Sequence, residues 1–369
     1  MKRKYGGLGK ILLVFGAFCA LLVSCARCSL GGPGTPEEVT IMSYNVQNLF
    51  DAVDNGTEYR EFDPGESEWT ADLYYMRMFN LAEVVAAAVD GGPDVLVLQE
   101  VENSAVVEVL WTDILKRYRY RHAAVTDTPD SAVQLAVLSR YPILRSRSHG
   151  ISLGGAVYRD ILEVSLRVGN AELILFNNHW KSKYGGAEET EPVRIMAAEV
   201  LRKRMGEIAA SRPGADMAVL GDLNENADEA VRVGGAYPTA LRQVEMEGSG
   251  APAAADLRGL AVTGDSSRVS FEGDRGGDLI LYSPWLDPGR PADGPEGSYY
   301  YDGGWETIDH ALLSAGFFDE TGFSYGGFRP VAEDFILTHR GHPKRWMTSS
   351  LSGYSDHLPL VLVLSVEEE

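Results

Sequence analysis

Several apolar runs in this sequence end in residues that can take part in chemistry. The run DVLVLQE ends at Glu100, LILFNNH ends at His179, and MAVLGDLN contains Asp222 and Asn224 at its end. Polar groups are costly to bury without partners, so carboxylates, amides and imidazoles repeated after apolar runs indicate one shared site at a sheet edge. The candidate residues, in chain order, are Asn45, Glu100, His179, Asp222, Asn224, Asp309, Asp356 and His357.

These residue types together indicate metal-assisted hydrolysis of a phosphoester. The candidate carboxylates and the amide of Asn45 offer oxygen ligands, which suits Mg²⁺, with Mn²⁺ as the alternative. Imidazoles such as His179 and His357 can donate to phosphoryl oxygens or move protons near pH 7. Asp222 and Asn224 lie two residues apart, on one face of an extended chain, and so can orient a water molecule and a phosphate oxygen together.

The elements that must position these residues alternate between strand-like and helix-like runs after residue 39. Helices are expected at 70–90, 101–115 and 192–210. Strands are expected at 39–46, 94–99, 118–125, 132–138, 143–151, 158–168, 171–177, 217–220, 307–314 and 358–364. Residues 248–255 read as a low-complexity surface loop, and residues 287–304 are expected to be irregular. No strong boundary interrupts the body, so residues 39–369 are predicted to form one domain.

The first residues are predicted to be an export signal rather than part of the fold. A basic start precedes a short apolar stretch, and the segment LVSC ending at Cys25 resembles a bacterial lipobox. We therefore expect a signal peptide at 1–24, a lipidated Cys25, and a Gly/Pro-rich tether over 25–38. The protein would be exported and anchored by lipid to a bacterial membrane, in the periplasm or on the cell surface. An ordinary signal peptide and an uncleaved anchor helix are the alternatives.

Composition narrows the possible functions. The chain has 369 residues, of which 45% are apolar, so it can build a real core. Its three cysteines all lie within the first 28 residues, which excludes a disulfide framework or a thiolate site in the body. The formal charge of −20 becomes (33 − 4) − 53 = −24 after removal of residues 1–24. This acidity argues against a sequence-independent clamp on nucleic acid, but not against a metal-dependent enzyme.

Six segments of the chain resemble the endonuclease/exonuclease/phosphatase superfamily. They are SYNVQNLFD, LQEVEN, NNHWKSK, GDLNE, TIDHALLS and SDHLPL, which occur in the family's order between residues 43 and 360. Each segment alone is weak evidence, but six in order are strong evidence. The resemblance implies an α/β fold, a four-layer α/β sandwich in which two mixed β-sheets pack face to face with helices on both outer faces.

The resemblance also implies where metal and substrate would be held. Asn45, Glu100 and Asp356 match metal-site positions, and Glu100 is the principal ligand. Arg159 matches a basic residue near the phosphate. Lys181 is either a phosphate contact or a solvated loop charge. The implied cofactor is Mg²⁺, with Mn²⁺ possible.

The catalytic roles follow from the same resemblance. His179 matches the residue that contacts the scissile phosphate, Asp222 the acid that orients or deprotonates water, and Asn224 the neighbouring phosphate-orienting amide. Asp309 matches the acid that is paired with the catalytic histidine, which is His357 here. By contrast, the neighbouring amide Asn178, the next histidine, His310, and the aromatic segment 299–305 are better explained as packed structural residues.

The leading hypothesis is therefore a surface-anchored, Mg²⁺-dependent phosphodiesterase, a nuclease acting on DNA or RNA. The alternative enzyme is a phosphatase or sphingomyelinase-like phospholipase acting on small phosphoesters or lipid head groups. A third possibility is a non-catalytic binding protein on the same fold. The expected partners are a nucleic acid or phosphoester substrate and a membrane contacted only through the lipid anchor; no protein partner is inferred.

Overall fold

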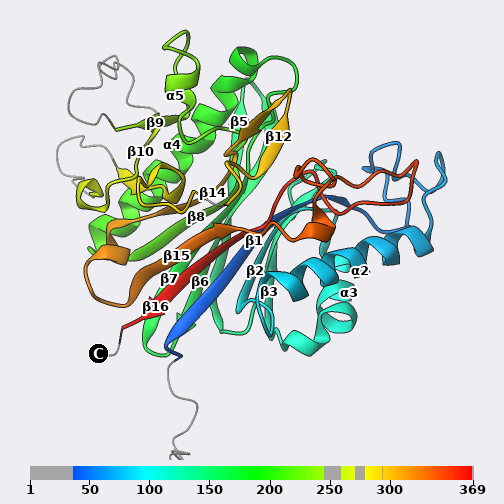
Figure 1. Ribbon diagram of the computed structural model, residues 1–369, viewed down its shortest axis with the longest axis horizontal. Coiled ribbons are helices and arrows are strands. Elements are labelled where there is room, and N and C mark those ends of the chain that lie inside the picture. The colour runs from blue at the N-terminus through cyan, green and yellow to red at the C-terminus, as the bar shows by residue number, and fades with distance from the viewer. Residues whose placement is uncertain (1–35, 245–258, 271–278, 293, 368–369) are drawn as a thin grey trace, which may run out of the picture. The chain divides into compact units, whose positions relative to one another are not determined.

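Two mixed β-sheets pack face to face in this protein (Figure 1). The computed structural model describes residues 36–244, 259–270, 279–292 and 294–367. The first sheet has the order β15 (Phe323–Pro330), β16 (Leu360–Val366), β1 (Glu38–Leu49), β2 (Val95–Val101), β4 (Gln134–Ser139) and β3 (His122–Val125). The second has the order β5 (Ile143–Leu153), β6 (Ala156–Val168), β7 (Ala171–His179), β8 (Asp216–Asp222), β14 (Asp309–Leu313), β11 (Ile280–Tyr282), β10 (Leu260–Thr263) and β9 (Leu241–Gln243).

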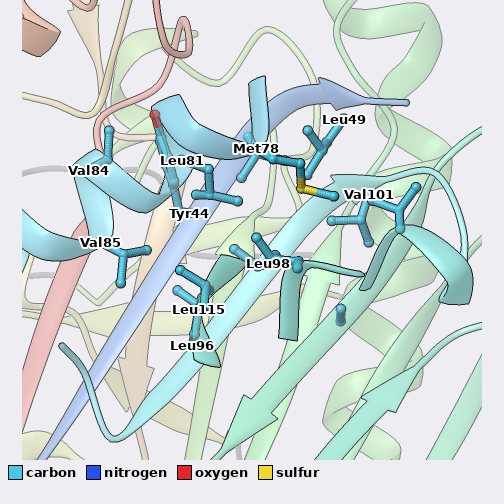
Figure 2. Close-up of a cluster of buried hydrophobic side chains, with 14 of the residues drawn as sticks. Tyr44, Leu49, Met78, Leu81, Val84, Val85, Leu96, Leu98, Val101 and Leu115 are labelled. Atoms are coloured by element: carbon cyan, nitrogen blue, oxygen red, sulfur yellow. The ribbon is translucent and has the colours of Figure 1, made fainter. Parts of the chain in front are cut away.

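The outer face of the first sheet is covered by helix α2 (Ala71–Ala88), which the sequence predicted over 70–90. The side chain of Thr70 caps its first turn by accepting from the backbone N–H of Leu73. Figure 2 shows buried side chains of α2, including Met78 and Leu81, packed against Leu96 and Leu98 of β2. Helix α3 (Ser104–Val109) joins this layer.

The space between the sheets is filled by alternate residues of the strands. Val39 and Ile41 of β1 face the second sheet, whereas Met42 and Tyr44 face the α2 layer. This alternation follows from the two-residue period of a strand. Helix α4 (Ala187–Ser211) covers the outer face of the second sheet. The predicted order of helix, sheet, sheet and helix is therefore confirmed.

Helix α4 begins five residues before its predicted start at Pro192. Proline favours the first turn of a helix, which explains the prediction. The extra turn is stabilised by Arg194, whose guanidinium donates to the carbonyl of Ala187 at 2.7 Å, and by the Thr190 hydroxyl, which donates to the carbonyl of Gly186 at 2.7 Å.

Two other segments differ from the prediction. The helix expected over 101–115 is α3 followed by a π-helical turn at Leu110–Ile114, and the strand expected over 118–125 starts only at His122. Arg119 has a positive φ of 61°, which interrupts an extended chain at that point.

The segment 287–304, expected to be irregular, contains strand β12 (Tyr299–Tyr301), and β12 pairs with β13 (Gly304–Glu306) in a short hairpin. Strands β9, β10, β11 and β15 were also missing from the prediction. The β12–β13 hairpin and strand β15 lack the alternation that would mark them in sequence, because each is only partly buried.

The predicted signal peptide, Cys25 and most of the predicted tether lie outside the described residues, as does the loop at 248–255. The described residues belong to one compact unit, Pro36–Glu369. None of the helices in this part of the chain has both the length and the apolar character needed to cross a membrane.

Candidate active site

The ends of five strands bring the candidate residues together at one edge of the two sheets. β7 and β8 are parallel with His179 opposite Asp222, and β14 is antiparallel to β8 with Asp309 opposite Asp222. In the first sheet, β1 and β2 are parallel, with Asn45 opposite Gln99, the residue before Glu100. Register alone therefore places the polar strand ends side by side.

The centre of the site is an amide shared by two carboxylates. The side-chain NH₂ of Asn45 donates to Glu100 Oε1 and to Asp222 Oδ2, both at 3.0 Å. Glu100 has a positive φ of 65° at a bulge in β2, and its second oxygen accepts from the backbone N–H of Asn48 at 2.8 Å. Strain of this kind is typical of functional positions.

Burial changes the acidity of both carboxyl groups. Burial raises the pKa of Asp222 to about 7; the nearby His357 opposes this shift and Asp309 adds to it. Burial, reinforced by the charge of Asp356, also raises the pKa of Glu100. Two acids that are pushed toward the neutral form at one point create a site where added positive charge is stabilising.

His179 faces these two acids. Its Nε2 lies 3.5 Å from Glu100 Oε1 and 3.7 Å from Asp222 Oδ2. Burial, together with the charge of Arg159, lowers the pKa of His179 well below its usual value. The imidazole is therefore neutral at pH 7 and can donate one hydrogen bond to a phosphoryl oxygen without adding a charge.

His357 forms the opposite side of the site. Its Nδ1 lies 2.7 Å from Asp309 Oδ2, and its Nε2 lies 3.9 Å from both Asp222 Oδ2 and Asp356 Oδ1. Burial alone would lower the pKa of His357, but the paired Asp309 carboxylate raises it well above its usual value. The pair therefore favours a protonated imidazole whose Nε2–H points toward the acids.

Ser298 supports this pair, and sequence reasoning did not find it. Its hydroxyl donates to Asp309 Oδ2 at 2.6 Å, and its carbonyl accepts from the backbone N–H of Leu358. The ring of Tyr299 packs on the ring of His357 with centroids 4.7 Å apart. The only sequence signal was the cluster of tyrosines at 299–301, of which Tyr299 packs on His357, whereas Tyr301 stacks on Tyr299 with 62% of its surface exposed.

The remaining predicted residues are close to the site but have other partners. Asn224 has a positive φ of 51°; its backbone N–H donates to Asp222 Oδ1 at 2.8 Å, while its side chain donates to the carbonyl of Trp180. Arg159 donates to the carbonyls of His179 and Trp180, at 2.9 and 2.6 Å. Lys181 donates to the carbonyls of the loop that follows it.

The two residues treated as structural have packed positions. The side chain of Asn178 donates to the carbonyls of Phe176 and Leu220, and it accepts from the indole N–H of Trp180. His310 is fully buried on the opposite face of β14, and its Nε2 lies 2.8 Å from the carbonyl of Glu225. The sequence interpretation of both residues agrees with these contacts.

The donor atoms fit a hard divalent cation. Glu100, His179 and Asp222 offer ligand atoms that lie within 4.8 Å of one another, and so do Asp222, Asp309 and His357. Asp356 lies next to the second set through His357. The donors are carboxylate oxygens and imidazole nitrogens, and oxygen-rich sets of this kind suit Mg²⁺ or Mn²⁺ rather than a thiophilic metal.

Solved structures with this architecture have low sequence identity to the chain. A truncated TDP2 from Caenorhabditis elegans is 17% identical with a TM-score of 0.52, over 89% of this chain and 98% of that one. The human Nocturnin catalytic domain with bound sulfate is 15% identical with a TM-score of 0.51, over 89% and 95%. Danio rerio TDP2 complexed with a single-strand DNA product is 15% identical with a TM-score of 0.50, over 90% and 100%. These similarities establish the fold.

No curated protein matches the sequence. A sequence model of the Endonuclease/Exonuclease/phosphatase family, however, matches residues 40–236, which is more than half of the chain. The matched segment contains Asn45, Glu100, His179, Asp222 and Asn224. This chain therefore belongs to the Endonuclease/Exonuclease/phosphatase family, whose members are hydrolases that act on phosphoesters, generally with a divalent metal.

Proposed function

We propose that this protein is a Mg²⁺-dependent phosphodiesterase that cleaves DNA or RNA. The observation that supports this most directly is the position of the Asp222 carboxylate. It accepts hydrogen bonds from the Asn45 amide and the Asn224 N–H, and it faces the imidazoles of His179 and His357 within 4 Å. An acid held between two imidazoles can activate water next to a phosphorus atom.

Asp222 is the base in this proposal. Its Oδ1 is fixed by the Asn224 N–H, so Oδ2 is the oxygen directed toward the imidazoles. A carboxyl with a pKa of about 7 accepts a proton from water far more effectively at neutral pH than an ordinary aspartate does. Asp222 therefore orients the attacking water and removes its proton.

The histidines bind the phosphoryl group from two sides. His357 is held in one orientation by Asp309 and Ser298, and in its protonated form it donates through Nε2 to the developing negative charge. His179 donates to a second phosphoryl oxygen. Glu100 and Asp356 would hold the metal, which when bound neutralises charge on the phosphoryl oxygens, and Asn45, expected as a metal-site residue, would orient Glu100 through its amide NH₂.

The test is cleavage of supercoiled plasmid and of a single-stranded oligonucleotide by the purified protein, with Mg²⁺ or with a chelator. We expect cleavage only with the metal, and none by the Asp222→Asn or His357→Ala variants. Asp216→Asn is a matched control, because Asp216 begins the strand that Asp222 ends. Intact nucleic acid after long incubation of the wild type with several divalent metals would reject the proposal.

The net charge of −20 supports a second candidate, a hydrolase of small phosphoesters or lipid head groups. A polyanion is repelled by an acidic protein more strongly than a small monoanion is. Release of phosphate or phosphocholine from defined substrates, without cleavage of polynucleotide by the same preparation, would favour this candidate.

We further propose that the enzyme is exported and held on a bacterial membrane by lipid on Cys25. This rests on the segment LVSC and the basic, then apolar, start of the chain. Mass analysis of the mature N-terminus should show a lipidated cysteine and the loss of residues 1–24. A mature chain that starts at Met1, or at another residue without lipid, would contradict this.

A further inference from the structure

A large pocket opens next to His179, on the side of the site away from His357. Its volume is about 680 Å³, which is within the usual range for small-molecule sites. Five segments line it: the loop at 57–59, the loop at 128–132, the hairpin joining β5 and β6, the segment 179–181, and helix α4. The pocket therefore spans the edges of both sheets, directly beside one of the proposed phosphate-binding imidazoles.

The walls of the pocket are rich in flat and branched apolar groups. Tyr59, Tyr158 and Trp180 contribute rings, and Val157 lies at the rim with 64% of its surface exposed. The indole N–H of Trp180 is bound by the Asn178 side chain, so Trp180 presents carbon surface to the pocket. Walls of this kind suit a planar ring system.

The polar groups of the pocket are of three kinds. The loops at 57–59 and 128–132 contribute the hydroxyls of Thr57, Thr128 and Ser131 and the carboxylate of Asp130. On the side of the catalytic centre lie two cations, Arg159 and Lys181, both tied to backbone carbonyls of the segment that follows His179. The pocket thus combines apolar walls and hydroxyls with positive charge close to where a phosphate would sit.

We infer that this pocket binds the nucleoside attached to one side of the scissile phosphate. The inference rests on the proposed function, because it requires the phosphorus atom to lie at His179. A nucleoside offers a planar base for the rings and a hydroxylated sugar for the polar side. An acyl chain would use none of these hydroxyls and neither of the two cations.

The test compares three diesters that release the same 4-nitrophenolate. They are thymidine 5′-(4-nitrophenyl phosphate), bis(4-nitrophenyl) phosphate and hexadecyl 4-nitrophenyl phosphate, assayed with the full-length protein and Mg²⁺. Because the leaving group is shared, the ratio of kcat/KM values reports on binding of the other substituent. We expect the wild type to prefer the thymidine ester over both others.

Val157→Trp should fill the rim of the pocket. We expect it to lower the ratio of kcat/KM for the thymidine ester to that for the bis(4-nitrophenyl) ester by about 5- to 100-fold, the range for loss of one base-stacking contact. Ser131→Trp, from the opposite loop, should act in the same direction and keeps the test valid if the hairpin variant does not fold. Val231→Trp is the control, since Val231 lies on α5 (Glu229–Arg232), outside the pocket lining, and is 60% exposed.

The possible outcomes separate this inference from the proposed function. Hydrolysis of the bis(4-nitrophenyl) ester without a preference for the thymidine ester would overturn the nucleoside pocket while leaving the phosphodiesterase intact. Preference for the hexadecyl ester, lost in Val157→Trp, would assign the pocket to an acyl chain and also overturn it. If all three esters stay intact with Mg²⁺ and Mn²⁺, the proposed function fails and the inference fails with it.

Discussion

Two buried ionic networks meet in the loop after β8, and they differ in the source of their positive charge. The first, which we name the catalytic network after the proposed function, consists of Asn45, Glu100 and Asp222 with the imidazoles of His179 and His357. The Arg194 network joins Arg194 to Glu191 and Glu225, at 3.0 and 2.9 Å from its Nε. Only the second contains a guanidinium hydrogen-bonded to its carboxylates.

This difference indicates that the Arg194 network stabilises the fold, whereas the catalytic network is suited to bind a cation. Arg194 and Glu225 are fully buried, and the guanidinium also binds the carbonyls of Lys181 and Ala187. The network therefore fastens α4 to the segment after His179, and one guanidinium serves two carboxylates. In the catalytic network, amides are the hydrogen-bond donors to the acids, so it gains most from an external cation.

The strongest test of the difference between the two networks removes one acid from the catalytic network. Asp222→Asn should lower kcat by about 10²- to 10⁴-fold, the range for loss of a general base. Its melting temperature should not fall, because the buried carboxyl with its raised pKa does not stabilise the fold. Single-turnover kinetics and a thermal melt check both parts. A clear loss of stability would mean that the two networks are of the same kind.

In the Arg194 network, by contrast, we expect removal of one charged group to lower the stability of the fold. Arg194→Met leaves Glu191 and Glu225 buried without their partner, so the free energy of unfolding should fall by about 3–5 kcal/mol. Urea unfolding measures this. Arg232→Met, on α5, is the control, because its ion pair with Asp228 is exposed and should be worth at most about 1 kcal/mol. Equal losses in both variants would contradict the assignment.

Metal binding should distinguish the two networks further, because only the catalytic network is expected to bind a divalent cation. A divalent cation that binds only the folded protein stabilises it by about 2.7 kcal/mol at one hundred times its Kd. We expect Mg²⁺ to raise the melting temperature of the wild type, and Glu100→Gln to lose this increase. Arg232→Met should keep it. An equal rise with NaCl at the same ionic strength would show that the effect is not binding at Glu100.

The sequence predicted that Glu100, His179 and Asp222 would lie close together, because the signal for each of them is local. Each of the three residues follows an apolar run. A buried strand that ends in a polar residue indicates the position of the site. The individual helices and strands could be predicted from their periods, which mark their buried faces, whereas the arrangement in four layers followed from the family resemblance.

The rest depends on contacts that are distant in sequence. Ser298 lies in a Gly/Pro-rich segment and gains its role only when β14 and the His357 segment meet around it. The positive φ angles of Glu100 and Asn224 arise from a bulge and a turn whose register is set by neighbouring strands. Arg159 was expected near phosphate, but its binding to two carbonyls follows from how β7 ends.

The smallest expected effect on stability comes from Asp216, at the other end of β8. This acid belongs to neither network. Its Oδ1 is buried without a hydrogen-bond partner among the described residues, and burial together with the charge of Asp319 raises its pKa to about 8. A carboxyl with a raised folded-state pKa gives full stability below its unfolded value, near 4, and that stability is lost as the pH rises toward 8.

Asp216→Asn should therefore be more stable than the wild type, by a margin that grows from pH 4 to pH 8 and reaches about 1–2 kcal/mol. Unfolding in urea across this pH range measures the margin. The catalytic rate should not change, because Asp216 lies at the far end of the strand from the site. A constant margin at every pH would show that the gain comes from packing or hydrogen bonding and not from the buried charge.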